Sequence, residues 1–269
     1  MDRRTLRTII VLAIFLVGFW LASCSDSTSE SNSNPSKFKI CLIDAPANYD
    51  AVYIDIEDVQ VNYSNDDAGW ASLENVRKGV VNILDLSCGS ELLIAEGMAK
   101  EGFLSEIRLM LGADNTVVVD GVSHMLSTPS AQQSGLKLKI NKSISSRQLH
   151  QLIVDFDANK SIVKAGNSGK YNLKPVLRVF TDETAGAISG IVQPIDVMSS
   201  VTAISNVTKE EFGTVTNEFG EYFICGLNDG SYNLMIEPAE DSGYLEALIE
   251  DVQVVDASVT SVETVTLSN

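Results

Sequence analysis

The chain has 269 residues, of which 45% are hydrophobic, so it can bury a substantial core and global disorder is not expected. Its 19 basic and 36 acidic residues give a formal net charge of −17. Such a surface repels phosphate backbones, which argues against nucleic acid as a partner. The four cysteines follow no metal-ligand spacing, and we expect no metal site and no cofactor.

The first segment, residues 1–23, has the pattern of an export signal. Three arginines precede an apolar run over residues 9–20, which is too short to serve comfortably as a membrane span. The run ends in Leu21-Ala22-Ser23-Cys24, and this order resembles the lipobox of bacterial lipoproteins. The resemblance implies a diacylglycerol on the Cys24 thiol and attachment to the membrane through that lipid. The alternative is an ordinary secretory leader that happens to end before a cysteine, and either interpretation predicts export.

Residues 24–36 are rich in serine and asparagine and predict a flexible tether. Fully extended, it would reach about 40 Å. The leader holds three arginines and one aspartate, which leaves 16 basic and 35 acidic residues and a formal charge of −19 for the mature part. This charge would repel an anionic leaflet, so only the lipid is expected to contact the membrane.

Residues 37–183 carry the period-two hydrophobic pattern of β-strands. We expect strands at 37–44, 52–63, 80–86, 104–111, 116–119, 136–144, 149–156 and 171–180. The alternation over 52–63 changes phase, which predicts a bulge at Glu57 and Asp58. Asp120 and Gly121 predict a type I′ hairpin turn. Residues 91–100 could form one short helix, although Gly97 disfavours it.

Residues 184–269 begin a second round of short strands. They are expected at 186–192, 201–205, 213–227, 230–238, 245–255 and 259–267. Short strands recur between clusters of Gly, Asn and Asp, and long helical periodicity is absent from the sequence. The pattern therefore predicts an all-β chain with two consecutive antiparallel β-sandwich domains, 37–183 and 184–269.

The second half resembles the carboxypeptidase regulatory-like domain, which is a transthyretin-like β-sandwich. The matching segments are Gly190-Ile-Val192, Thr216-Asn-Glu-Phe-Gly-Glu-Tyr-Phe223, Gly226-Leu227 and Gly230-Ser-Tyr-Asn-Leu234. This fold is grouped with starch-binding-like domains, so the resemblance implies carbohydrate binding as one role and a purely architectural role as the other.

The first half resembles a bacterial family described as domain of unknown function 4382 (DUF4382). The matching segments include Asp44-Ala-Pro46, Asn82-Ile-Leu-Asp-Leu86, Val117-Val-Val-Asp-Gly-Val122, Asp155-Phe-Asp157 and Leu173-Lys-Pro-Val-Leu-Arg178. The family is common in surface lipoproteins of Bacteroidetes-type organisms. The resemblance implies an outer-membrane lipoprotein, exposed at the cell surface, and implies no activity.

The sequence offers no convincing catalytic set. Ser123 and His124 are neighbours on a strand and point to opposite faces, and His150 stands alone at a strand start. Two pairs of carboxylates, Asp55 with Glu57 and Asp155 with Asp157, have a separation of about 7 Å that could suit an acid and a base. Their alternation with Ile54, Ile56 and Phe156 instead predicts solvated strand faces. We therefore expect a protein that is not an enzyme.

Calcium and disulfide bonding are the open chemical questions. Residues 65–67 and the region of Asp44 and Asp50 could supply oxygen ligands, but no spaced calcium loop is present and turn formation explains the pattern equally well. With Cys24 assigned to lipid, three thiols remain and cannot all pair. Cys41 and Cys225 lie in apolar runs typical of buried unpaired cysteines, and a Cys41–Cys88 disulfide is the alternative in an exported protein.

Four residues are candidates for ligand binding. Trp70 and Tyr63 could stack on a sugar ring, although Trp70 could equally plug the end of the sandwich; Gln132 and Gln133 lie in the polar segment 128–135, which could instead be a simple connection. The sequence thus predicts a lipid-anchored, non-enzymatic binding or adhesion module of the cell envelope, with glycan as the expected ligand class. The alternative is a structural accessory subunit that docks another envelope protein.

Overall fold

A computed structural model describes residues 36–45, 47, 49–64, 66, 68–128, 134–145, 147–166, 168–181 and 184–269. The leader, Cys24 and the tether up to residue 35 lie outside this described part, as do Gln132 and Gln133. Ser36, which we assigned to the tether, is already the first residue of a strand. Within the described residues, no helix combines the length and the apolar character that crossing a membrane requires.

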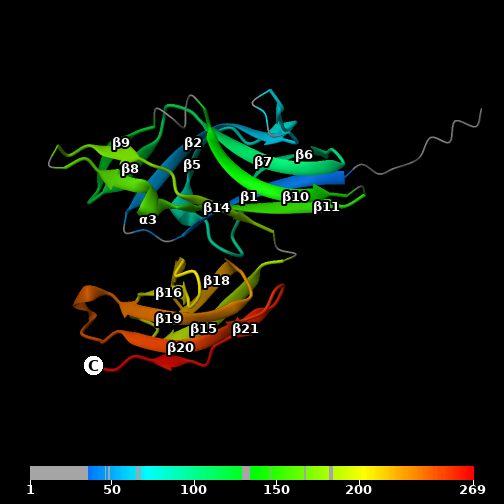
Figure 1. Ribbon diagram of the computed structural model, residues 1–269. Helices are drawn as coiled ribbons and strands as arrows, with labels where there is room; N and C mark the ends of the chain where they lie inside the picture. Colours follow the sequence, from blue (N-terminus) through cyan, green and yellow to red (C-terminus); the bar gives the residue numbers. More distant parts are fainter. Residues whose placement is uncertain are drawn as a thin grey trace, which may run out of the picture. The chain divides into compact units, whose positions relative to one another are not determined.

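The described residues up to Phe180 form an all-β sandwich of two sheets (Figure 1). One sheet has the order β14-β11-β1-β6-β4; the other has the order β10-β7-β2-β8-β9-β13-β12, with β3 and β5 also paired to β2. The elements are β1 (Ser36–Ala45), β2 (Ala51–Asn62), β3 (Trp70–Ser72), β4 (Asn75–Val76), β5 (Gly79–Asn82), η1 (Ile83–Asp85), β6 (Leu92–Ala99), β7 (Gly102–Leu111), β8 (Thr116–Val119), β9 (Val122–Ser127), β10 (Leu136–Ile144), β11 (Leu149–Asp157), α3 (Ala158–Ser161), β12 (Ile162–Lys164), β13 (Tyr171–Leu173) and β14 (Leu177–Phe180).

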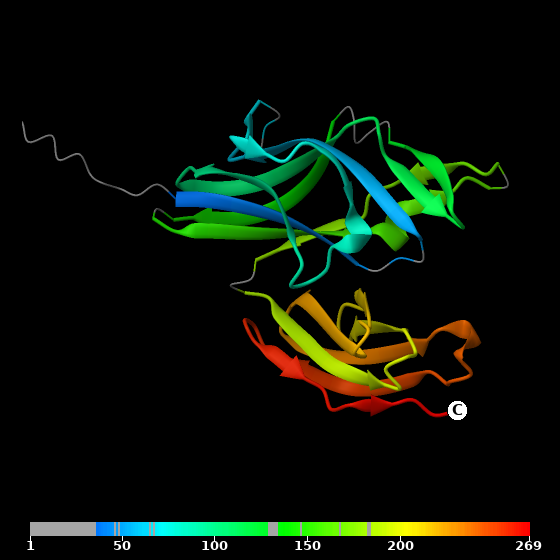
Figure 2. The same ribbon diagram turned by 180° about the vertical axis from the view of Figure 1, so that it is seen from behind.

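The second sandwich follows from Gly186 and also has two sheets, coloured from yellow-green to red in Figures 1 and 2. One sheet has the order β18-β15-β21, with β22 also on β15; the other has the order β17-β16-β19-β20. The elements are β15 (Gly186–Gln193), β16 (Ser199–Ser205), β17 (Glu211–Val215), β18 (Glu221–Leu227), β19 (Gly230–Pro238), η2 (Glu240–Ser242), β20 (Ala247–Val254), β21 (Val259–Ser261) and β22 (Val265–Thr266).

Most strand pairs are antiparallel, as the hairpin-rich sequence predicts. Four pairs are parallel, namely β1 with β11, β9 with β13, and β15 with β21 and with β22. In the first of these, β1 lies between parallel β11 and antiparallel β6. Because β1 and β11 run side by side in the same direction, their carboxyl ends reach the same edge of the sheet. That edge carries the acidic side chains described below.

Two local predictions are confirmed. The register between β2 and β7 shifts between Ile56 and Asp58, which is the predicted bulge. Asp120 and Gly121 join β8 to β9 with φ values of 51° and 74°, as a type I′ turn requires. The bulge lets both halves of β2 face the core, since Ile54 and Ile56 before it and Val59 and Val61 after it are buried.

Residues 91–100 are not a helix, so this prediction was wrong. Leu92–Ala99 forms β6, which pairs with β1 on one side and with β4 on the other. Gly97 suits its position in this strand, because a side chain there would press on the Leu73 side chain and the Glu74 backbone. Long-range pairing to a buried strand thus overrides the local helix propensity of this segment.

Each sandwich has its own hydrophobic core. The first core includes Phe38 of β1, Leu104 of β7 and Phe156 of β11, all fully buried. The second includes Ile188, Val201 and Leu234 from three strands of its two sheets. A small third cluster contains Cys41, Ile43 and Ile153 of the first sandwich, and Cys225 of the second packs against it. The third cluster therefore marks a junction between the two sandwiches.

Candidate functional site

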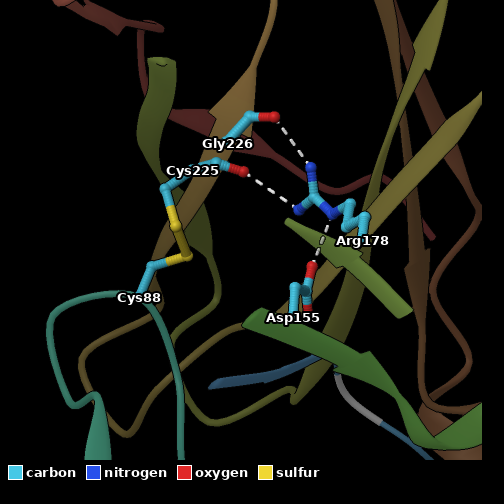
Figure 3. The surroundings of a disulfide bond; sticks show 5 residues. All are labelled: Cys88, Asp155, Arg178, Cys225 and Gly226. Atoms are coloured by element: carbon cyan, nitrogen blue, oxygen red, sulfur yellow. Dashed lines mark hydrogen bonds and ion pairs between the residues drawn. A yellow bond between two sulfur atoms is a disulfide. The ribbon is translucent and has the colours of Figure 1, made fainter. Parts of the chain in front are cut away.

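A disulfide bond joins the two sandwiches at this junction. Cys88, in a turn after η1, is bonded to Cys225 of β18, with Cα atoms 6.0 Å apart and a sequence separation of 137 (Figure 3). The Cys41–Cys88 alternative and the unpaired state of Cys225 are therefore wrong. Cys41 is buried outside the disulfide, in β1. The correct pair joins residues of different sandwiches, which local sequence patterns do not report.

Arg178 of β14 is the second link across the junction. Its Nε lies 2.6 Å from Asp155 Oδ2, while Nη1 and Nη2 donate to the backbone oxygens of Gly226 (2.8 Å) and Cys225 (3.1 Å) (Figure 3). The guanidinium also lies 4.4 Å from the ring centroid of Phe212. One side chain thus binds a carboxylate of the first sandwich and two carbonyls and a ring of the second.

Gly226 allows the backbones to approach at this place. Its φ is 73°, and a side chain there would collide with the Phe180 ring. Phe180 in turn packs against the cluster of Cys41, Ile43 and Ile153, as the two disulfide cysteines also do. Only glycine combines the left-handed conformation with so little space, so this position is specialised for the junction.

The prediction that Asp155 lies on a solvated strand face was wrong. It is only 5% exposed, because Arg178 and the second sandwich cover this side of β11. Burial raises the pKa of Asp155, and the charge of Arg178 opposes that rise. Asp157 accepts the Lys160 N–H at the start of α3 and forms an ion pair with Lys160 (3.0 Å). Both carboxylates therefore have structural partners. Asp55 has one as well, because it accepts the Asp114 N–H.

A groove of about 980 Å³ lies at the junction, and we call it the junction groove. The first sandwich contributes Asp44, Ala47, Tyr49, Asp50 and residues 84–88, and the second contributes parts of β15, β17 and β18. Its apolar walls include Leu84, Leu86, Ile191, Met198 and Phe223. Its charged lining residues are all acidic, namely Asp44, Asp50, Asp85 and Glu221.

Two buried polar atoms in the lining of the junction groove have no hydrogen-bond partner among the described residues. Asp44 is 5% exposed, and its Oδ1 accepts the Ala158 N–H (3.0 Å) while its Oδ2 is unpartnered. Tyr222 is 3% exposed, and its hydroxyl is unpartnered. Burial, reinforced by Asp155 and Asp157, raises the pKa of Asp44 to about 9, and burial raises the pKa of Tyr222 to about 12.

We expect Asp44 to make the fold less stable as pH rises. Its pKa is 3.8 unperturbed and about 9 in the folded protein, so between these values the folded state holds a proton that the unfolded chain releases. The free energy of unfolding should therefore fall as pH rises from 4 to 9, and Asp44→Asn should flatten that fall. Urea unfolding of both proteins at several pH values measures this. Identical pH profiles would contradict it.

The predicted ligand residues Trp70 and Tyr63 are not brought together. Trp70 of β3 is half-buried, with Arg108 4.4 Å and Lys137 5.6 Å from its ring centroid, and its Nε1 has no hydrogen-bond partner. The Tyr63 hydroxyl instead accepts the Lys100 N–H (2.9 Å), and its ring packs against the first core. Burial raises the pKa of Tyr63. Each aromatic therefore belongs to a different surface.

Trp70 lies beside a row of hydrogen-bonded polar side chains on β2, β3 and β7. Asp58 Oδ2 accepts from Ser72 Oγ (2.6 Å) and from Gln60 Nε2 (2.7 Å), and Arg108 Nε donates to Gln60 Oε1. We call Asp58, Gln60, Trp70, Ser72 and Arg108 the Trp70 face. Gln132 and Gln133 lie outside the described residues. The chain is described again from Ser134, and Gly135 lies next to Arg108.

The two histidines have structural surroundings. The His124 ring packs at a tilt against the Tyr171 ring, with centroids 4.9 Å apart, and the buried His150 has its Nε2 3.1 Å from the Ser145 carbonyl oxygen. Asp66 accepts the Ala68 N–H two residues further on, as turn residues do, whereas Asp50 accepts the N–H of the distant Gly121 in the turn between β8 and β9. Across the residues that the structure covers, no three His, Cys, Asp or Glu side chains gather closely enough for a metal site.

A family model, described as "Domain of unknown function (DUF4382)", matches residues 35–175. The chain belongs to the DUF4382 family. The match confirms the resemblance of the first half and covers β1 to β13, with Asp44, Cys88 and Asp155. Arg178 and the second sandwich of this DUF4382 protein lie beyond it. No curated protein matches the chain.

Solved structures of low similarity accompany the family match. The Bacillus anthracis TIE protein is 10% identical (TM-score 0.24), with 87% of this chain and 34% of that chain covered, so the chain spans about a third of its length. The minor pilin GBS52 of Streptococcus agalactiae is 10% identical (TM-score 0.25; 86% and 97% covered). The shaft pilin SpaA of Lactobacillus rhamnosus GG is 7% identical (TM-score 0.23; 87% and 98% covered).

Proposed function

We propose that this DUF4382 protein is an exported lipoprotein of the bacterial envelope, anchored through Cys24, that works as a non-enzymatic binding or adhesion module. The observation that carries the proposal is the Cys88–Cys225 disulfide. Structural disulfides persist in oxidising compartments and are rare in the cytosol, so the bond supports the export that the leader predicts. The lipobox and the serine-rich tether support attachment at the outer membrane with the sandwiches held away from the lipid.

The second sandwich is proposed to be a carboxypeptidase regulatory-like domain. Its geometry supports the resemblance at the motif residues. Asn217 Oδ1 accepts the N–H groups of Phe219 and Glu221, which closes the turn before β18. Tyr222 lies against Gly190, where a side chain would collide with its ring, and Tyr232 is buried after Gly230. These motif residues thus have structural tasks in the second sandwich.

Glycan is the proposed ligand class, and the Trp70 face is the proposed surface. It places an aromatic ring beside a carboxylate, an amide, a hydroxyl and a guanidinium group. A mixture of aromatic surface and a few convergent polar groups is typical of small-molecule sites, because the polar groups fix orientation. Hydroxyl-rich sugars offer both donors and acceptors to such a row.

A glycan array probed with the soluble fragment 25–269, with and without Ca²⁺, tests the ligand class. We expect at least one glycan to bind, and Trp70→Ala to weaken that binding about tenfold, since loss of an aromatic anchor typically costs 1–2 kcal/mol or more. Phe219→Ala is the control, because it removes an aromatic ring that is 60% exposed on a different surface. An empty array, or equal loss in both variants, would contradict glycan binding at the Trp70 face.

Localisation is tested separately from the ligand. Mass spectrometry of the native protein should find an acylated Cys24 as its first residue, and the protein should enter the detergent-rich phase on phase separation. Protease treatment of whole cells should cleave it if it is displayed at the surface. An unmodified amino terminus, or partition into the aqueous phase, would contradict the lipid anchor.

The second candidate function is that of an accessory subunit of an envelope complex. Exposed apolar side chains of the second sandwich favour it, since Ile195 is 50%, Phe219 60% and Met198 64% exposed. Ile195 lies next to Gly220, which follows Phe219, so two of the three side chains belong to one region. Crosslinking in intact envelopes distinguishes the functions, because a subunit would capture one protein in stoichiometric amount and a glycan binder would not.

A further inference from the structure

The junction groove has an unbalanced charge. Its lining contains four carboxylates, Asp44, Asp50, Asp85 and Glu221, and the described lining contains no Lys, Arg or His. Some of these charges have local donors, since Asp50 accepts the Gly121 N–H and Glu221 accepts from Asn217 Nδ2. None of these donors carries a positive charge. A cation that enters the groove would therefore meet acidic side chains and no positive charge among the described lining residues, and the partly apolar walls make such an attraction stronger than on an open surface.

A second, independent observation indicates where a cation would bind. Asp44 lines the groove and is only 5% exposed. Its Oδ2 has no hydrogen-bond partner among the described residues. The Tyr222 hydroxyl lines the same groove, is equally buried and is also unpartnered. Buried polar groups normally have partners, and each exception requires an explanation. A donor group of a ligand at Asp44 would supply the partner that Oδ2 lacks.

We propose that the junction groove binds a peptide segment that carries a lysine or arginine side chain between apolar residues, with the cationic group at Asp44. The volume of about 980 Å³ exceeds the needs of a single ammonium group. The walls formed by Leu84, Leu86, Ile191, Met198 and Phe223 suit apolar neighbours of that side chain. This ligand and this surface are distinct from the glycan and the Trp70 face, so the inference does not depend on them.

Binding should be linked to pH. In the free protein, burial keeps Asp44 protonated, and the carboxylates of Asp155 and Asp157 on β11 favour that state. Arg178 faces Asp155, and Lys160 faces Asp157, so neither cation neutralises Asp44. Around the groove, Asp50, Asp85, Glu221 and Tyr222 add no positive charge. A bound cation replaces the proton of Asp44, so the affinity should rise with pH between 6 and 8.5.

The probe is the fluorescent peptide acetyl-Leu-Lys-Leu-Lys-Leu-amide, measured by anisotropy with the full chain in a non-ionic polyoxyethylene detergent at 150 mM salt. Met198→Lys places a positive charge in the groove and should weaken binding about tenfold. Met125→Lys is the control, because Met125 is as exposed as Met198 (63% against 64%) but does not line the groove. This variant should change the affinity for the peptide less than twofold. Equal weakening by both variants would overturn the proposal.

Three further measurements complete the test. Asp44→Asn should weaken binding and abolish its rise with pH, while Trp70→Ala should leave binding unchanged. The same peptide with acetylated lysines should not bind, and spermidine should compete only weakly because it lacks apolar side chains. Unchanged binding of the acetylated peptide would overturn the cationic contact, and binding of spermidine as tight as that of the peptide would overturn the peptide as occupant. Loss of binding in Trp70→Ala would place the peptide at the other surface.

Discussion

Replacing both Cys88 and Cys225 with serine is expected to lower the free energy of unfolding by about 2–5 kcal/mol. The bond links residues 137 apart, so it closes a large loop in the unfolded chain and lowers the conformational entropy of that state. The chain-entropy relation gives about 5 kcal/mol for a loop of this length, and removing a native disulfide typically costs about 2–5 kcal/mol. Urea unfolding of the double variant and of the oxidised wild-type chain measures the difference.

Reduction provides the control for this prediction. Dithiothreitol should destabilise the wild-type chain to the level of the double variant and should leave the double variant unchanged. Cys41→Ala changes a buried cysteine outside the disulfide, so its stability should still respond to dithiothreitol. A wild-type chain whose unfolding is insensitive to the reductant would show that the bond contributes nothing.

Arg178→Met is expected to destabilise the protein by about 3 kcal/mol. It leaves the carboxylate of Asp155, which is only 5% exposed, without a counter-ion, and breaking a buried pair on one side typically costs about 3–5 kcal/mol. Partial exposure of the Arg178 side chain (31%) places the expectation at the lower end of that range. The backbone oxygens of Cys225 and Gly226 also lose their donors. Chemical unfolding at pH 7 measures the loss.

The matched control is Lys160→Met, which removes the cation of a more exposed pair on the same strand end. Lys160 is 48% exposed, so its loss should cost less than about 1 kcal/mol. Adding Asp155→Asn to Arg178→Met should recover part of the lost stability, because the double variant no longer buries an unpaired charge. If Lys160→Met and Arg178→Met destabilise equally, the buried ion pair at the junction contributes no more to the free energy of unfolding than the exposed pair does.

The fold was largely predictable because strands leave a local signature. Alternation located β1, β8, β10 and β11, the phase change located the bulge in β2, and Asp120-Gly121 located a hairpin. Several predicted strands were too long, including 213–227, which is divided into β17 and β18, and 259–267, which is divided into β21 and β22. The 80–86 strand ends at Asn82, where η1 begins, and the 171–180 strand is interrupted around Pro175, which has no N–H to give to a ladder.

The junction was not predictable in the same way, because it is built by contacts between distant segments. The sequence placed Cys225 in an apolar run, but the partner of Cys225 is set by the packing of β18 against the first sandwich. Alternation assigned Asp155 to solvent, although tertiary cover buries it. Arg178 and Asp44 carried weak signals as charged residues within or at the end of apolar strands, where a charge requires a partner.

The candidate ligand residues show the same division. Trp70 was found because an isolated tryptophan in a polar stretch is conspicuous, but its neighbours Arg108 and Lys137 come from β7 and β10. Tyr222 was known only as a residue of the resemblance motif. Its role as an unpartnered hydroxyl in an acidic groove depends on the first sandwich, which supplies Asp44 from the other side.

The central claim is that a Cys88–Cys225 bond joins the two sandwiches, and a tryptic map under non-reducing conditions tests it directly. Trypsin places Cys41, Cys88 and Cys225 in three separate peptides, 40–77, 79–100 and 210–269. The account predicts one mass that corresponds to 79–100 linked to 210–269 and that separates into its two parts on reduction. A mass for 40–77 linked to 79–100, or three unlinked peptides from protein isolated from the envelope, would contradict it.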